Sequence, residues 1–290
     1  MTLHCSERKG RPVRPRAGLK VNQEAQGTPE PSIPPKSWVH RRRNIAVVSA
    51  SGSTGEDSRR ALRALGRSPW IFMNIDELRS LGSRLQQFEL LVFVYPASLE
   101  TTEHQDSPAS EVRKVMGEGV PVLLAFEGRA PASSVRVQDI NTGVASGPFT
   151  FSRFYILLHD FAVRHRIRIN PAAPEWGPYR FHTRTHSVSI GSAEVRLTPC
   201  EFDLAIELFY GMDRVVPTQR LDFIVAAHGS PAEKKSVHAR IAGLRNALDF
   251  DLTREWQIES VAGIGYRLLA PVVAVPESHN LGGRIGFGTR

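Results

Sequence analysis

Short apolar runs and segments of helical periodicity alternate along the middle of the chain. Compact runs such as NIAVVS (44–49) and ELLVFVYP (89–96) are typical of buried strands, and each precedes a stretch with helical spacing. One such stretch, IDELRSLGSRLQQ, predicts a single helix, and the last, from about Thr150 to Arg164, is strongly periodic. Repeated strand and helix pairs predict a parallel sheet covered by helices, so we expect a doubly wound α/β domain over residues 44–166.

A different pattern follows the Pro-rich segment IRINPAAPEWG, which we interpret as a linker over residues 167–176. Alternating short runs with a Gly-Ser turn come first, and then the segment LTPCE. In that segment Thr198 suits a helix N-cap, Pro199 suits the first helical position, and Glu201 suits the acid of a capping box. The sequence therefore predicts a helix that begins directly after Thr198.

Another amphipathic helix and a hairpin close the ordered part of the sequence. One apolar stripe is formed by residues at i, i+4, i+7 and i+11: Val237, Ile241, Leu244 and Leu248. The closing segment IESVAGIGYRLL has two short β-prone runs joined by a Gly-containing turn. Three helices followed by a hairpin predict a winged helix-turn-helix domain within residues 177–271.

Four pieces of this C-terminal segment occur in the order and spacing of a known family: LTPxEFDL, a hydrophobic RVV, V…I…LR…L, and GxGYRL. Residues 195–269 closely resemble the DNA-binding domain of the OmpR/PhoB family of bacterial response regulators. The α/β domain in front, with GPF before its last helix, resembles a receiver domain. The resemblance implies a flavodoxin-like, five-stranded parallel sheet, an antiparallel platform before the winged helix, and a transcription regulator that binds double-stranded DNA.

The resemblance also places the third helix of the winged-helix domain, roughly residues 232–248, in the major groove of DNA. Polar groups there can bind base edges, whereas Lys and Arg bind phosphates. For two of the arginines a purely structural role is an equal alternative, Arg245 and Arg267. The expected DNA-binding residues are Thr218, Arg220, Lys234, Lys235, Ser236, His238, Arg240, Arg245 and Arg267.

Three positions depart from the family pattern where basic or polar residues are usual: Ala242, Gly243 and Ala262. Each lost phosphate contact removes about 0.9 from the logarithmic salt slope of binding to duplex DNA. We therefore expect weak DNA binding by this domain alone, supplemented by dimerisation or by a basic tail. The rival hypothesis is a protein-interaction module that has lost strong DNA binding and titrates another regulator.

Receiver domains transfer a phosphoryl group to an Asp after the third strand, with Mg²⁺ held by acids after the first strand. In this chain the corresponding positions carry no charged side chain: Ser49, Ser51, Val94, Tyr95, Phe126 and Gly147. Since Val94 cannot accept a phosphoryl group, we expect a pseudo-receiver that works without Asp phosphorylation. In receivers the last helix and the strands beside it also form the dimer face, so the resemblance further implies a homodimer through this domain. The alternative is a helix that only closes its own domain. Regulation by a protein partner or a small ligand is a further expectation.

The net charge of +8 is concentrated at the start of the chain. Residues 1–43 hold ten basic residues against three acidic ones, whereas residues 177–271 hold eleven of each. We expect residues 1–43 and 272–290 to be disordered tails, because they are rich in Pro, Gly and polar residues. The first tail either clasps DNA phosphates or is a solvated extension, which could arise from a misplaced start codon.

Other classes of protein lack support in the sequence. The longest apolar runs, such as LLVFV, are far shorter than a membrane span, and no secretory signal is evident. Two cysteines and scattered histidines give no metal site or disulfide framework, which fits a reducing cytoplasm. The loop SASGSTGED could bind an anion but lacks the lysine of a phosphate loop, and Cys200 is interpreted as a passive thiol rather than a redox switch. We expect no enzyme activity and no cofactor.

Overall fold

The computed structural model describes residues 44–50, 52–96, 108–130, 139–229, 236–250 and 256–271. The two predicted tails, the pocket residue Ser51 and the basic pair Lys234 and Lys235 lie outside these ranges. Within them, no helix is both long and apolar enough to cross a lipid bilayer.

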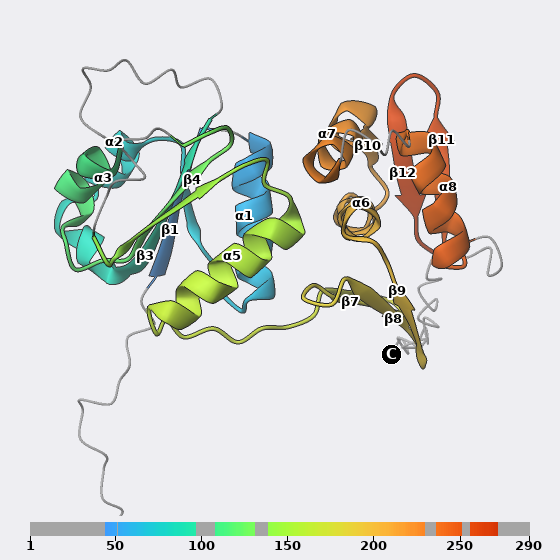
Figure 1. Cartoon of the computed structure of the whole chain (residues 1–290), viewed down its shortest axis with the longest axis horizontal. Helices are drawn as coiled ribbons and strands as arrows, with labels where there is room; N and C mark the ends of the chain where they lie inside the picture. Colours follow the sequence, from blue (N-terminus) through green and yellow to red (C-terminus); the bar gives the residue numbers. More distant parts are fainter. Residues whose placement is uncertain are drawn as a thin grey trace, which may run out of the picture. The chain divides into compact units, whose positions relative to one another are not determined.

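Five parallel strands form the sheet of the first domain (Figure 1). They are β1 (Asn44–Ser49), β2 (Trp70–Phe72), β3 (Phe88–Tyr95), β4 (Val122–Phe126) and β5 (Thr142–Ser146). Their order, β2-β1-β3-β4-β5, is the flavodoxin-like order, and every neighbouring pair is parallel. The predicted α/β fold is confirmed.

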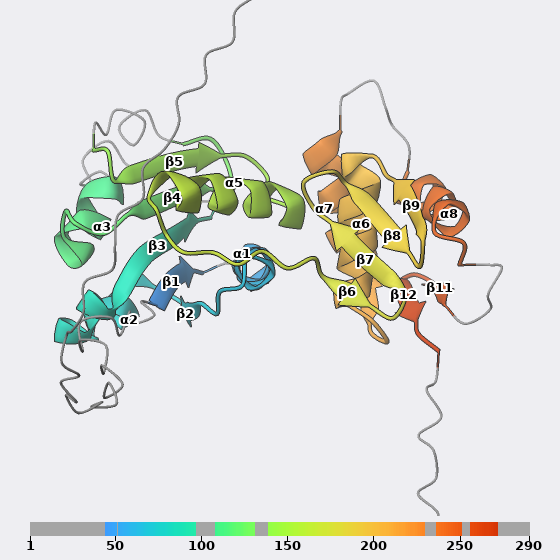
Figure 2. The same cartoon turned by 90° about the horizontal axis from the view of Figure 1, so that it is seen from below.

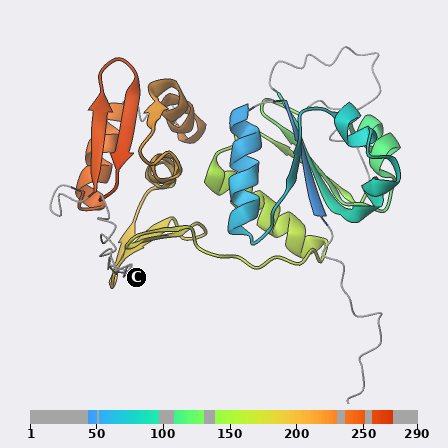
Figure 3. The same ribbon diagram turned by 180° about the vertical axis from the view of Figure 1, so that it is seen from behind.

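Helices cover both faces of this sheet (Figure 3). Helices α1 (Gly52–Ala64) and α5 (Phe151–Arg164) pack on one face, and α2 (Ile75–Arg79) and α3 (Pro108–Met116) on the other. One sequence-based boundary was wrong, because the single helix expected over IDELRSLGSRLQQ is interrupted. Gly82 has a φ of +52°, which ends the α-helical path, and a 3₁₀ helix, η2, follows over Gly82–Gln87.

A four-stranded antiparallel sheet begins at Glu175, inside the segment expected to be a linker (Figure 2). Its strands are β6 (Glu175–Trp176), β7 (Tyr179–His182), β8 (Ser187–Ile190) and β9 (Ala193–Arg196). Each strand pairs with the next in sequence, as expected for the platform of the resembled family.

The winged helix comprises three helices and a three-stranded sheet of order β10-β12-β11. The elements are α6 (Pro199–Tyr210), β10 (Val215–Pro217), α7 (Thr218–His228), α8 (Val237–Ala247), β11 (Gln257–Val261) and β12 (Gly265–Leu269). The predicted capping box is present, since Thr198 Oγ1 accepts from the Glu201 amide and the Glu201 carboxylate accepts from the Thr198 amide. The predicted helix start after Thr198 is confirmed.

One continuous hydrophobic cluster joins the two domains. It includes Phe154 and Leu158 of α5 together with Phe202, Leu204 and Phe209 of α6. The α2 and α3 face of the sheet has a separate cluster. The interface between the domains is therefore an extension of the core on one face of the sheet.

Candidate nucleic-acid interface and its connection to the first domain

Helix α8 is placed by the predicted apolar stripe. Val237, Ile241, Leu244 and Leu248 are all buried, in agreement with their spacing. The side chain of Ser236 accepts a hydrogen bond from the Ala239 amide at 3.4 Å, so Ser236 is the N-cap. The described helix therefore begins at Val237, later than the expected start near residue 232.

The exposed face of α8 carries small side chains and no charge. Its exposed members are His238, Ala239, Ala242, Gly243 and Asn246. A side-chain carbon added at Gly243 would meet only Glu201 Oε1, at 3.7 Å, so the helix backbone is accessible there. A helix of this kind can approach a partner closely but offers few cationic contacts from the described residues.

The two arginines of α8 point back into the domain. Arg240 is buried, with 8% of its surface exposed, and its Nε has no hydrogen-bond partner. Arg245 donates from Nε and Nη2 to the carbonyl oxygen of Ile258 in β11, at 3.2 and 2.7 Å. Arg245 thus fastens α8 to the wing, which supports the structural alternative for this residue.

Glycines determine the geometry of the wing. Gly263 has a φ of +70° in the turn between β11 and β12. A side-chain carbon at Gly265 would lie 2.0 Å from the carbonyl oxygen of Val216, so only glycine allows β12 to approach β10. Arg267 on β12 donates to Glu259 Oε2 at 2.6 and 3.1 Å, and this exposed pair lies within the wing.

Helix α7 connects the wing to the first domain. Thr218 donates to the carbonyl oxygen of Ile264 from its amide, at 2.9 Å, and from Oγ1, at 3.3 Å. Arg220, two residues later, donates from Nη2 to both carboxylate oxygens of Asp57 at 2.6 Å. Arg220 also donates to Glu207 Oε2 at 3.0 Å, so the structure gives this expected DNA contact partners inside the protein.

A buried ionic cluster surrounds Arg220. Glu207 of α6 accepts from Arg60 of α1 at 2.9 Å, and the Arg60 guanidinium lies over the ring of Tyr210 at 4.6 Å. Burial raises the pKa of Asp57 to about 7, opposed by the charges of Arg220 and Arg60 and assisted by that of Glu207. Two carboxylates and two guanidinium groups thus meet where the domains touch.

A second polar cluster links the same helices. Asp203 of α6 accepts from the amide and the hydroxyl of Ser152, at 2.9 and 2.7 Å. Ser152 lies in the first turn of α5, whose own N-cap residue, Thr150, makes no side-chain cap. Asp203 also lies 2.7 Å from Nε2 of His228, the last residue of α7. The winged helix therefore supplies the N-terminal cap of a helix in the first domain.

The expected phosphoacceptor positions at the carboxyl end of the sheet are filled by uncharged groups. Val94 is buried, and Tyr95 stacks on Phe126 with ring centroids 4.7 Å apart. Burial raises the pKa of Tyr95, with a further contribution from Glu111.

The positions around this aromatic stack are uncharged as well. Ser49 is buried beside Gly55, and Gly147 has a φ of +130°. The carboxylate of Glu127, which directly follows β4, lies nearby and accepts a hydrogen bond from the hydroxyl of Thr54 in α1.

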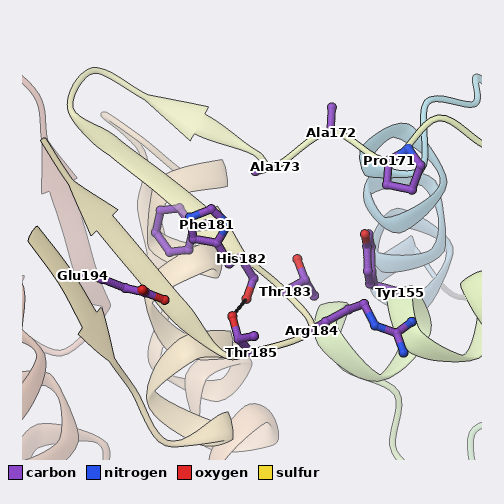
Figure 4. Close-up of a pocket in the computed structure, with 10 residues that line it drawn as sticks. All are labelled: Tyr155, Pro171, Ala172, Ala173, Phe181, His182, Thr183, Arg184, Thr185 and Glu194. Carbon is purple, nitrogen blue, oxygen red and sulfur yellow. Dashed lines mark hydrogen bonds between the residues drawn. The ribbon is translucent and has the colours of Figure 1, made fainter. Parts of the chain in front are cut away.

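A hollow of about 440 Å³ lies between α5, the linker and β7 (Figure 4). Its lining includes Tyr155, Phe181, Arg184 and Glu194. Several of its polar groups are engaged in hydrogen bonds: Thr185 donates to the carbonyl oxygen of His182, and Arg184 contacts Nδ1 of His159, outside the lining, at 2.9 Å. The described residues here form no convergent set of free polar groups.

The described residues also give no support to a reactive thiol or to a metal site. Cys200 is buried, and burial raises the pKa of its thiol, which is the opposite of what a reactive thiolate needs. No group of three or more His, Cys, Asp or Glu among the described residues could hold a metal ion.

The sequence did not indicate the role of these polar residues at the interface between the domains, and Arg220 was expected to contact DNA instead. Asp57 lies in a charged helix, and its partner Arg220 is 163 residues away. A single sequence contains no signal for such a pair. Asp203 is part of LTPxEFDL, and its burial between hydrophobic neighbours in α6 is the only local indication of a special role.

Comparison with known proteins identifies the C-terminal domain. Residues 192–268 match the family model described as "Transcriptional regulatory protein, C terminal". No curated protein is similar enough in sequence to match the chain.

Several solved structures resemble the chain at low identity. The DNA-binding domain of Klebsiella pneumoniae RstA, solved with its RstA box, is 22% identical and covers 33% of this chain and 96% of that chain, with a TM-score of 0.29. The Thermotoga maritima OmpR/PhoB homologue DrrB is 18% identical and covers 78% and 99%, with a TM-score of 0.32. A streptococcal redox sensor evolved from response regulators is 18% identical and covers 79% and 99%, with a TM-score of 0.33. At these values, the three structures add nothing to the family match and the geometry.

Proposed function

We propose that this chain is a DNA-binding transcriptional regulator of the OmpR/PhoB type, because residues 192–268 match the C-terminal domain of transcriptional regulatory proteins and fold as a winged helix. The observation that supports the proposal most is the position of α8, whose apolar stripe is buried while its other face is exposed beside the wing. A helix exposed in this way is the element that winged-helix proteins place in the major groove. Double-stranded DNA is therefore the proposed partner, and the bacterial cytoplasm is the proposed location.

The proposed contacts come from three sources. His238 lies on the exposed face of α8, with its Nδ1 3.2 Å from the hydroxyl of Tyr266, and can reorient toward a base or phosphate. Thr218 and Ser236 lie at helix N-termini, where backbone amides favour phosphate. Lys234 and Lys235 precede α8 in the sequence and would supply positive charge.

Regulation without aspartyl phosphorylation is the second part of the proposal. A phosphoryl acceptor needs a carboxylate at the end of β3, where Val94 and Tyr95 are buried, and the Tyr95 ring is stacked on Phe126. The chain is also proposed to form a homodimer through its first domain and to respond to a protein partner or a small ligand. The apolar side chains of α5, Phe154 and Leu158, are buried in its own core, so the dimer would use other side chains.

The first experiment is selection of bound duplexes from a random DNA pool with the full chain. Enrichment of a defined sequence supports the regulator, and absence of enrichment together with absence of binding at low salt contradicts it. Incubation with acetyl phosphate and Mg²⁺ tests the second part, and a Mg²⁺-dependent acylphosphate on the first domain would contradict it.

The second candidate is a protein-interaction module that titrates another regulator. It is favoured by the uncharged face of α8 and by the internal partners of Arg220, Arg245 and Arg267. Chromatin immunoprecipitation separates the two functions. Focal peaks with a shared sequence support the DNA-binding regulator, whereas peaks that vanish when the captured partner is deleted support the module.

A further inference from the structure

Helix α7 links two contacts at its first turn. Thr218 binds the wing at the carbonyl oxygen of Ile264, and Arg220 binds Asp57 of the first domain. The opposite side of α7 packs within the winged helix through Leu221 and Ile224, which are buried in the shared core. Because the same turn holds both contacts, a shift of α7 would move the wing and change the support of α8.

Asp57 is a fixed point for this helix. Its side chain has no exposed surface, and both of its carboxylate oxygens lie 2.6 Å from Nη2 of Arg220. Arg60 of α1 lies 3.9 Å from Asp57 and 2.9 Å from Glu207, which closes the cluster. A charge buried in this way cannot exchange its partner for water without a large cost, so the position of Arg220 is closely defined.

We propose that Asp57 is a positioning residue for the helix-turn-helix: through Arg220 it holds α7, and with it the wing and α8, in the arrangement that binds DNA. The inference rests on the proposed DNA-binding function. A side chain built into the receiver-like domain then sets the DNA affinity, and no phosphoryl group is required. Asp57 itself has no exposed surface with which to contact DNA.

The alternative relation between Asp57 and DNA is competition. In that case Asp57 would withhold Arg220 from a DNA phosphate, and its removal would strengthen binding. The salt dependence of binding separates the two relations, because the logarithmic slope counts phosphate contacts at about 0.9 each. Positioning predicts weaker binding with the same slope, whereas competition predicts stronger binding with a slope steeper by about 0.9.

The test compares the full wild-type chain with Asp57→Asn on a duplex of about 30 base pairs, roughly three helical turns. The duplex is the one enriched by the wild type, or a mixed-sequence duplex of that length if enrichment fails. We expect about tenfold weaker binding at every salt concentration and an unchanged slope. Hydrogen exchange should also become faster in residues 218–228 and 257–269.

A matched control is Asp76→Asn, which removes the same charge from the same domain. Asp76 is 75% exposed in its side chain and pairs only with the exposed Arg79 among the described residues. Its replacement should leave both affinity and exchange unchanged. If Asp57→Asn fails to fold by circular dichroism, Arg220→Lys keeps the positive charge, loses the planar guanidinium, and should weaken binding with an unchanged slope.

Unchanged or increased affinity in both variants overturns the positioning role while leaving the DNA-binding function intact. A loss equal to that of Asp76→Asn overturns it as well, because the effect would then be one of net charge. If the wild-type chain binds neither duplex, the DNA-binding function fails, and the positioning role fails with it.

Discussion

The two faces of the five-stranded sheet bury similar apolar side chains but have different neighbours. On the α1 and α5 face, residues such as Phe154 and Leu158 belong to a cluster that continues into α6. On the α2 and α3 face, Phe88 and Leu78 belong to a cluster confined to the first domain. One face of the sheet therefore packs, through its helices, against the winged helix, and the hydrophobic cluster on the other face lies within the first domain.

The polar side chains differ between these regions in the same way. At the carboxyl end of β3 and β4 the side chains are aromatic, with Tyr95 between Phe93 and Phe126. Beside the shared face, by contrast, Asp57 and Ser152 are buried with partners in the winged helix. Among the described residues, the buried Asp57 and Ser152 therefore serve the contact with the winged helix, whereas the carboxyl ends of β3 and β4 hold an aromatic stack.

The comparison predicts different consequences for two equivalent cavities. Phe154→Ala and Phe88→Ala each remove a nearly fully buried ring, and each should lower the free energy of unfolding by about 3–5 kcal/mol. Only Phe154→Ala should also loosen the winged helix, because only its cluster includes α6. Hydrogen exchange of residues 199–210 measures this, and equal protection in the two variants would show that the faces are energetically alike.

The ionic cluster on the shared face predicts a pH dependence. The pKa of Asp57 rises from 3.8 to about 7 in the fold, so its contribution to stability is present below pH 4 and is lost as the pH rises through 7. In that window the loss approaches about 1.4 kcal/mol per pH unit and amounts to about 2 kcal/mol between pH 5 and 7. Urea unfolding of the wild type and of Asp57→Asn at pH 5 and pH 7 measures the part of this loss that is due to Asp57. Parallel pH profiles of the two proteins would contradict the assigned shift.

Close packing on the shared face predicts sensitivity to a single methyl group. A side-chain carbon at Gly143 of β5 would lie 2.5 Å from Cε2 of Phe161 in α5. Gly143→Ala should therefore lower the free energy of unfolding by about 2 kcal/mol. Gly119→Ala is the control, since no heavy atom lies within 4 Å of the added carbon. Equal shifts of the melting temperature in the two variants would show that β5 and α5 move apart at little cost to accommodate the methyl group.

The smallest predicted effect compares a helix capped by its own sequence with one capped across the domain boundary. Thr198 caps α6 through the capping box, whereas Asp203 binds the first turn of α5. Thr198→Ala should lower the free energy of unfolding by about 1 kcal/mol, whereas Thr198→Ser keeps a capping hydroxyl and should lower it much less. Protection of the α5 amides should not change, and a matching loss there would mean that capping of the two helices is coupled.

Much of the fold could be predicted because its signals are local. The apolar runs of β1 and β3, the Thr198 cap and the Val237 stripe each lie within a few residues of what they determine. The interruption at Gly82 was missed because a glycine in an otherwise helical pattern is compatible with either a continuous helix or a break.

The candidate site was less predictable, since charge in the sequence does not show where a side chain points. Arg240 and Arg245 lie on a helix expected to face DNA, yet Arg240 is buried and Arg245 binds Ile258. A long side chain on an exposed helix can extend into solvent or fold back onto the protein, and tertiary contacts decide between the two directions. The Asp57 and Arg220 pair depends on the docking of two domains, which no short segment encodes.

The linker has a consequence for how far the two domains can separate. The amides of Asn170 and Ala172 donate to the carbonyl oxygens of Leu65 and Ala64 at the end of α1, at 2.9 and 2.8 Å. Only residues 173 and 174 lie between the second of these anchors and β6. With about 3.5 Å per extended residue, a winged helix released from its ion pairs stays within roughly 10 Å of its anchor. Its local concentration at the first domain then remains very high, so each opening is followed by rapid recapture.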